Sequence, residues 1–125
     1  MIYRLIDLPS SVIGFKALWH LTEKDFEEVL IPSVQDHVGK TGKLNCLIIL
    51  NNSVKQFQIS ALSGFKNLMH SKTHWYRVAI VSESKSTKLL INLLSTLFTA
   101  EFRVFSLDAL DQAITWAAQG RKKDQ

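Results

Sequence analysis

Apolar and polar residues alternate in blocks along the chain, and one apolar block lies near its centre. Residues 44–50 read Leu-Asn-Cys-Leu-Ile-Ile-Leu, with Gly42 and Lys43 before them and two asparagines and a serine after them. A run of this length between turn-forming residues is typical of a strand that is buried on both faces of a sheet. It is too short to cross a membrane. We therefore predict that this segment is the central strand.

Four further blocks have the pattern of strands, and these are residues 1–5, 12–18, 77–81 and 101–105. The first two are separated by a short segment that contains Pro9 and Ser10, which favours a turn and an antiparallel hairpin. Gly14 lies within the second predicted strand. A glycine at such a position predicts a bulge or a close approach of another backbone segment.

A helix is predicted to begin after Thr22, whose side chain is a good acceptor for the free N–H groups of a first helical turn. Pro32 lies on the apolar face of this helix and predicts a kink or two helical pieces, because proline lacks an N–H donor. Gly39 is the predicted end of the helix. Further helices are predicted from about Ser60, from Ser84 or Ser86 to about Phe98, and from a Ser106 cap to Gly120.

From residue 12 onward strands and helices alternate, which favours an α/β fold with parallel strands joined by right-handed crossovers. The first strand adds an antiparallel edge. We therefore predict a five-stranded mixed, mostly parallel sheet with about four helices. The length of 125 residues fits one domain, which we place at residues 1–120, followed by a basic, solvated tail at residues 121–125.

The composition is that of a globular protein, with 46% hydrophobic and 21% charged residues. The net charge of +4 is mild and the basic residues are not interleaved with aromatic ones, so we expect no nucleic-acid partner. Cys46 is the only cysteine, which excludes an internal disulfide. No signal peptide or transmembrane segment is recognisable. These features predict a soluble protein of a reducing compartment, the cytoplasm.

Polar residues follow two neighbouring predicted strands. The carboxyl ends of parallel strands meet at one edge of a sheet, where helix N-termini also offer free N–H groups to anions. We therefore predict a ligand site at this edge, although the same side chains could instead cap helices and solvate loops. The candidate ligand-binding residues are Asn51, Asn52, Ser53, Phe57, Ser82, Glu83 and Ser84.

The predicted helix at residues 89–98 is apolar around most of its circumference. A helix that covers one face of a sheet needs an apolar stripe only about 100° wide. Leu90 and Leu94 are therefore further candidates for ligand contact. The surplus apolar surface would be covered by a second copy of the chain, another protein, an apolar ligand or a peripheral contact with a membrane; burial beneath neighbouring helices is the alternative.

The histidines and the cysteine give no sign of a metal or cofactor. His70 and His74 are four residues apart, but the glutamate of a metalloprotease helix does not lie between them, and no further ligand cluster accompanies them. His20 and His37 are predicted to be solvated at the ends of elements. Cys46 is predicted to be a small buried hydrophobe rather than a nucleophile.

Several stretches resemble the SpoIIAA-like proteins, small stand-alone bacterial members of the STAS superfamily (sulfate transporter and anti-sigma-factor antagonist). Val-Ile-Gly-Phe-Lys-Ala at residues 12–17 leads to Leu-Thr-Glu-Lys-Asp-Phe at residues 21–26. The remaining stretches are Leu-Ile-Pro-Ser at 30–33, Trp-Tyr-Arg-Val-Ala-Ile-Val at 75–81, and Phe-Arg-Val-Phe-Ser-Leu-Asp-Ala-Leu-Asp-Gln-Ala at 102–113, closing at Trp116. The resemblance covers nearly the whole chain.

The resemblance implies a βα superhelix, structurally similar to lipid-carrier domains of the CRAL-TRIO type, and no enzymatic activity. Anti-sigma-factor antagonists are switched by phosphorylation of a serine that follows an aspartate after the central strand. The corresponding residues 51–60 contain no Asp-Ser pair, and their serines are Ser53 and Ser60.

We therefore expect a non-catalytic binding or regulatory module. Its ligand would be a small apolar, lipid-like or anionic molecule, or a protein partner such as a second copy of the chain. The alternative is a partner-switching regulator controlled by phosphorylation of Ser53 or Ser60, because a phosphate there would lie near a positive helix end.

Overall fold

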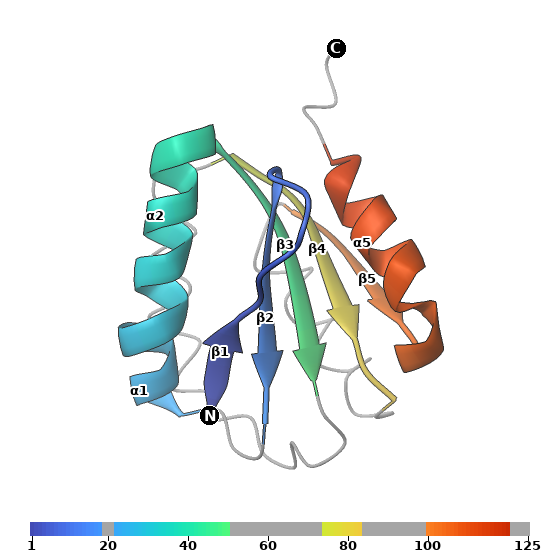
Figure 1. Ribbon diagram of the computed structural model, residues 1–125, viewed down its shortest axis with the longest axis horizontal. Coiled ribbons are helices and arrows are strands. Elements are labelled where there is room, and N and C mark those ends of the chain that lie inside the picture. Colours follow the sequence, from blue (N-terminus) through green and yellow to red (C-terminus); the bar gives the residue numbers. More distant parts are fainter. Residues whose placement is uncertain (19–21, 51–73, 84–99, 121–125) are drawn as a thin grey trace.

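The structure, a computed structural model, describes residues 1–18, 22–50, 74–83 and 100–120 (Figure 1). Within these residues five strands form one sheet, and their order in the sheet is their order in the sequence. The strands are β1 (Ile2–Arg4), β2 (Val12–Ala17), β3 (Lys43–Leu50), β4 (His74–Val81) and β5 (Glu101–Phe105). The predicted α/β fold and the central position of the third strand are confirmed.

The pairing of the strands is mixed. β1 runs antiparallel to β2, with Ile2 opposite Ala17, and the N–H of Val12 donates to the Pro9 carbonyl at 2.9 Å in the turn between them. All other neighbouring pairs are parallel. The sheet is therefore mostly parallel with one antiparallel edge, as the short first loop predicted.

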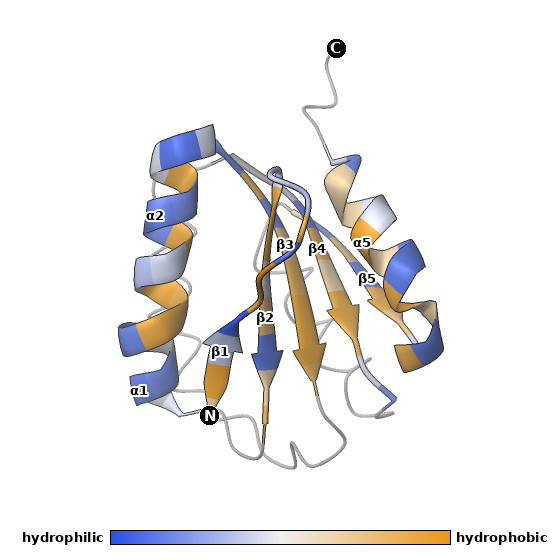
Figure 2. Cartoon of the chain, in the orientation of Figure 1, coloured by the Kyte–Doolittle hydropathy of each residue, from blue (hydrophilic) through white to orange (hydrophobic). Residues whose placement is uncertain are grey.

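β3 is buried on both of its faces, as expected for a central strand that reads as a continuous apolar run. Leu44 and Cys46 belong to one hydrophobic cluster, whereas Leu47 and Ile49 belong to the cluster on the opposite face. Figure 2 shows that β3 and its neighbours are mainly apolar along their length. Burial raises the pKa of the Cys46 thiol to about 12, so this cysteine is the small hydrophobic residue that was predicted.

The helical segment that precedes β3 begins as predicted. The Thr22 hydroxyl accepts a hydrogen bond from the Asp25 N–H at 3.2 Å, while the Asp25 carboxylate accepts one from the Thr22 N–H at 3.0 Å. This reciprocal pair satisfies two backbone donors at the helix start. The segment is divided into α1 (Glu23–Asp25), a π-helical turn η1 (Phe26–Leu30) and α2 (Ile31–Thr41). Pro32 lies in the first turn of α2, which confirms the predicted division.

The predicted end of this helix at Gly39 is wrong. α2 continues through Gly39 to Thr41, and Gly42 caps it with a φ of 70° and an N–H bond to the Val38 carbonyl at 2.7 Å. A left-handed residue closes the last turn, and glycine adopts that conformation without steric cost. Two glycines lie three residues apart here, and only the backbone conformation distinguishes the cap from the helical residue.

The helix α5 (Leu110–Ala118) follows β5 after a short 3-10 turn, η2 (Leu107–Ala109). Ser106 occupies the predicted N-cap position, at the start of the η2 turn that leads into α5, but its hydroxyl bonds the Asp108 carboxylate and makes no side-chain cap bond to the backbone. α5 ends just before Gly120, whose N–H donates to the Ala117 carbonyl at 3.0 Å.

α2 and α5 cover opposite faces of the sheet (Figure 1). On the α2 side the buried cluster includes Leu30 and Val34. On the α5 side it includes Ala113 and Ala117, neither of which has any exposed surface. The predicted helices near residue 60 and up to residue 98, and the predicted tail at 121–125, lie outside the described residues.

Candidate functional site

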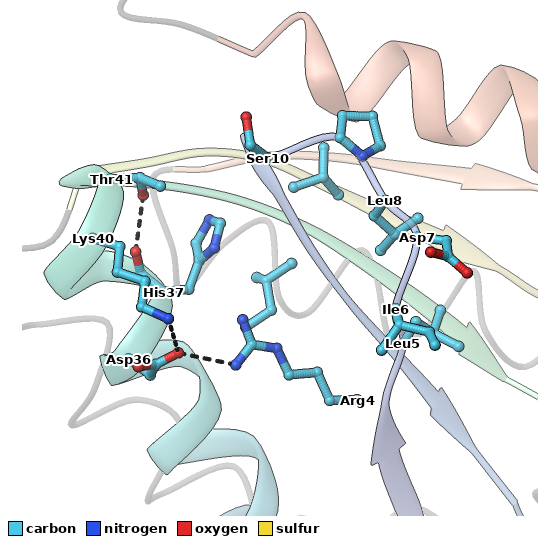
Figure 3. Close-up of a pocket in the computed structure, with 13 residues that line it drawn as sticks. Arg4, Leu5, Ile6, Asp7, Leu8, Ser10, Asp36, His37, Lys40 and Thr41 are labelled. Carbon is cyan, nitrogen blue, oxygen red and sulfur yellow. Dashed lines mark hydrogen bonds and ion pairs between the residues drawn. The ribbon is translucent and has the colours of Figure 1, made fainter.

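The pocket of interest, called here the α2 pocket, opens between the β1–β2 connection and the carboxyl-terminal half of α2 (Figure 3). Its volume is about 650 Å³. β2 and β3 begin beside it, so it lies at the sheet edge opposite the one where the sequence predicted a ligand. It is lined by Arg4, Leu5, Ile6, Asp7, Leu8, Pro9, Ser10, Val12, Ile13, Asp36, His37, Lys40 and Thr41.

The β1–β2 connection lies directly against β2 and supplies the apolar wall of the pocket. The Leu5 N–H donates to the Gly14 carbonyl at 2.8 Å. A Cβ atom at Gly14 would overlap the Leu8 side chain and would lie 3.2 Å from Leu5 Cδ1. The close approach predicted from Gly14 is therefore confirmed. Between these two leucines, the side chain of Ile6 is left 82% exposed.

A charged cluster forms the opposite wall. Asp36 Oδ2 lies 3.1 Å from Arg4 Nη1 and 3.4 Å from Lys40 Nζ. The hydrogen bond from Arg4, with the charge and hydrogen bond of Lys40, holds the pKa of the Asp36 carboxyl below its ordinary value. All three groups are substantially exposed. One carboxylate therefore faces two cations on this wall.

The His37 side chain projects from α2 beside the charged cluster (Figure 3), and His37 is only 5% exposed. Its Nε2 atom is buried and finds no hydrogen-bond partner in the described part of the chain. Burial, reinforced by the positive charge of Arg4, lowers the pKa of His37, so the imidazole is neutral near pH 7. A buried polar atom without a partner is costly and uncommon in folded proteins.

The prediction that His37 is solvated is therefore wrong. A signal for its burial was present in the sequence, because His37 follows Leu30 by seven positions and Val34 by three. That spacing places it on the inner stripe of the helix. The residues that complete the pocket, such as Arg4 and Ile6, come from a distant segment, and no local pattern connects them with α2.

Two of the residues predicted at the carboxyl edge of the sheet are described. Ser82 is buried, and its N–H donates to the Phe105 carbonyl at 2.9 Å. Glu83 accepts a hydrogen bond from the Leu107 N–H at 2.7 Å, so its carboxylate lies at the start of η2. The other candidates lie outside the described residues, and they are Asn51, Asn52, Ser53, Phe57, Ser60, Ser84, Leu90 and Leu94.

Across residues 1–18, 22–50, 74–83 and 100–120, no group of three potential metal-ligating side chains comes together. His74 is the first residue of β4, and His70 lies outside the described residues. Among the helices that are described, none is both long and apolar enough to span a membrane.

The SpoIIAA-like family model matches residues 12–118 of the chain. The chain belongs to the SpoIIAA-like family. This confirms the resemblance seen in the sequence. A solved structure with a SpoIIAA-like fold, an uncharacterized protein of the DUF3478 family from Shewanella loihica PV-4, is 22% identical, with a TM-score of 0.65 and 93% of each chain covered. No curated protein matches the chain significantly.

The family match divides the α2 pocket into two parts. Residues of the α2 wall, His37 among them, lie within the matched region, as do the first residues of β2. Arg4 and the apolar side chains up to Leu8 precede it. The SpoIIAA-like match therefore covers the wall that holds the buried histidine, and the N-terminal segment of this chain completes the pocket.

Proposed function

We propose that this chain is a non-catalytic binding module of the SpoIIAA-like type that holds a small organic molecule with an apolar body in the α2 pocket. The observation that carries the proposal is the unpartnered, buried Nε2 atom of His37 on the wall of a pocket of about 650 Å³. A ligand that hydrogen-bonds this atom would relieve a desolvation penalty of about 1–3 kcal/mol.

The apolar wall supports a ligand with an apolar body. Leu5 and Leu8 pack closely against β2 because Gly14 has no side chain there. Ile6 lies between them in the sequence, with 82% of its surface exposed. Pockets for small molecules are commonly lined by apolar side chains with a few polar groups that fix the orientation of the ligand. Six of the thirteen residues that line this pocket are apolar, and the other seven supply charged or polar groups.

The state of the polar side chains supports binding rather than catalysis. A histidine that activates a hydroxyl nucleophile is within hydrogen-bond reach of it, whereas His37 Nε2 has no partner among the described residues. The Thr41 hydroxyl, which also lines the pocket, is engaged with the backbone carbonyl of His37 at 3.0 Å. Cys46 is buried within the sheet with a raised pKa.

The proposal is tested with the neutral fluorescent dye Nile red. We expect the full chain to raise the fluorescence of the dye, and the variant Ile6→Asp to lower its affinity by about tenfold, because a charge then replaces apolar contact surface. Leu107→Asp is the matched control, since Leu107 is also an exposed apolar residue, at 40%, and does not line the pocket.

Circular dichroism checks that both variants fold. The proposal would be contradicted by a wild-type chain that does not bind the dye. It would also be contradicted by equal losses of affinity in Ile6→Asp and Leu107→Asp, because binding would then not depend on the α2 pocket.

A further inference from the structure

The charges beside His37 do not cancel. Arg4 and Lys40 carry two positive charges, and Asp36, which contacts both, carries one negative charge. The Asp7 carboxylate also lines the pocket, but Figure 3 shows it on the far side, away from this cluster. Counted over the described residues, the wall next to the buried imidazole therefore has an excess of one positive charge.

The groups that face His37 come from three elements. Arg4 comes from β1, and Asp36 and Lys40 come from α2. Ser11, in the turn before β2, makes a backbone hydrogen bond with the imidazole. Of these, Arg4 carries a planar guanidinium, which binds a carboxylate through two parallel hydrogen bonds. In the free protein one of its nitrogens is bonded to Asp36 at 3.1 Å.

We propose that the α2 pocket takes the acid group of a small apolar monocarboxylic acid, a proposal that rests on the function proposed above. The carboxylate binds the guanidinium of Arg4 in place of Asp36, and it accepts a hydrogen bond from the Nε2–H of His37 when the imidazole is protonated. Its single negative charge matches the single excess positive charge of the wall. The apolar body lies against the side chains of the β1–β2 connection, next to Ile6.

Asp36 competes with the ligand. Its carboxylate occupies the same guanidinium and lies on the exposed side of α2, so the acid must displace it. Removing the charge of Asp36 should strengthen binding, whereas removing that of Arg4 should weaken it. These opposite effects distinguish an acid site from a generally apolar pocket.

Binding is also coupled to pH. Burial and the charge of Arg4 lower the pKa of His37 in the free protein, and a carboxylate bound beside it would oppose both effects. The pKa of His37 is then higher in the complex than in the free protein, so the complex takes up a proton as pH falls. Affinity for the acid should therefore increase as the pH is lowered from about 8 to about 6.

Three probes with the same chain length test the inference by displacing Nile red: octanoate, 1-octanol and octylammonium. We expect octanoate to bind at least about tenfold more tightly than either of the others, the difference that one charge-assisted hydrogen bond supplies. Arg4→Gln should abolish this preference, and Arg103→Gln, which removes an exposed arginine from β5, should keep it. Asp36→Asn should raise octanoate affinity about threefold or more.

The outcomes separate this inference from the proposed function. If 1-octanol displaces the dye as well as octanoate does, the pocket binds apolar molecules and the acid site is wrong. An octanoate affinity that is unchanged in Asp36→Asn and does not vary with pH also overturns it. If Nile red itself does not bind in the α2 pocket, the proposed function fails.

Discussion

At the scale of single residues, His37 combines two roles that are usually separate. Its position on the inner stripe of α2 buries it like a core residue, and its Nε2 atom is left without a partner on the wall of the α2 pocket. Such an atom lowers the stability of the free protein, because it has lost its hydrogen bonds to water. Binding sites often retain groups that are unfavourable until a ligand arrives.

We therefore expect His37→Leu to be more stable than the wild type in the absence of ligand, by about 1 kcal/mol at pH 8. Because burial and Arg4 lower the pKa of His37 when folded, the unfolded chain takes up a proton at higher pH than the folded one. Wild-type stability is then highest above about pH 6.5 and is lost as pH falls below it.

The variant lacks this titrating group, so its advantage should grow between about pH 8 and pH 5. Urea unfolding at several pH values measures the difference. A variant that is less stable at every pH would contradict the view that Nε2 of His37 is unsatisfied.

At the scale of elements, the helical segment before β3 is defined by its two ends. Thr22 and Asp25 satisfy backbone donors at the start, and Gly42 closes the end with a left-handed backbone conformation. The carboxyl-terminal half of α2 carries the charged and histidine side chains of the pocket. The position of these side chains therefore depends on where the helix stops.

Gly39 and Gly42 give a matched pair of substitutions in α2. A Cβ atom at either glycine would meet no heavy atom within 4 Å, but only Gly42 has a positive φ, of 70°. Gly39→Ala should stabilise the protein by about 0.5–1 kcal/mol, because alanine is the better helix former. Gly42→Ala should destabilise it by about 1–2 kcal/mol through backbone strain. Thermal unfolding followed by circular dichroism compares them, and equal effects would place the cap elsewhere.

At the scale of the whole molecule, the described chain is a sheet with helices on both faces. The small residues Ala113 and Ala117 have no exposed surface, and they bring α5 close to β4 and β3. Their cluster contains Leu47 and Val81 from the sheet. The second face of the sheet therefore depends on close packing by small side chains.

Ala117→Leu should destabilise the protein by about 1–3 kcal/mol, because the larger side chain has no space between α5 and the sheet. Thr115→Leu is the control on the same helix: Thr115 is exposed, and the change should alter the free energy of unfolding by less than about 0.5 kcal/mol. Chemical denaturation measures both. A neutral effect of Ala117→Leu would show that α5 is not packed tightly on the sheet.

The fold was largely predictable from local patterns, whereas the pocket was not. The apolar run of β3, the turn at Pro9 and the capping side chain of Thr22 each specify structure within a few residues. The α2 pocket joins Arg4 to Asp36, which are 32 positions apart, and no periodicity relates such distant segments. Similarly, the choice between Gly39 and Gly42 as the helix end depends on a backbone angle that composition does not encode.

The order of the strands has a consequence for how the polypeptide is made. Each strand from β2 to β5 pairs with the strand immediately before it in the sequence, so none has to be inserted between two partners that are already joined. During synthesis, the β1–β2 hairpin emerges before β3, β4 and β5, and each of these strands can pair with the exposed edge of the strand made before it. The strands of this sheet therefore leave the ribosome in the same order in which they pair with one another.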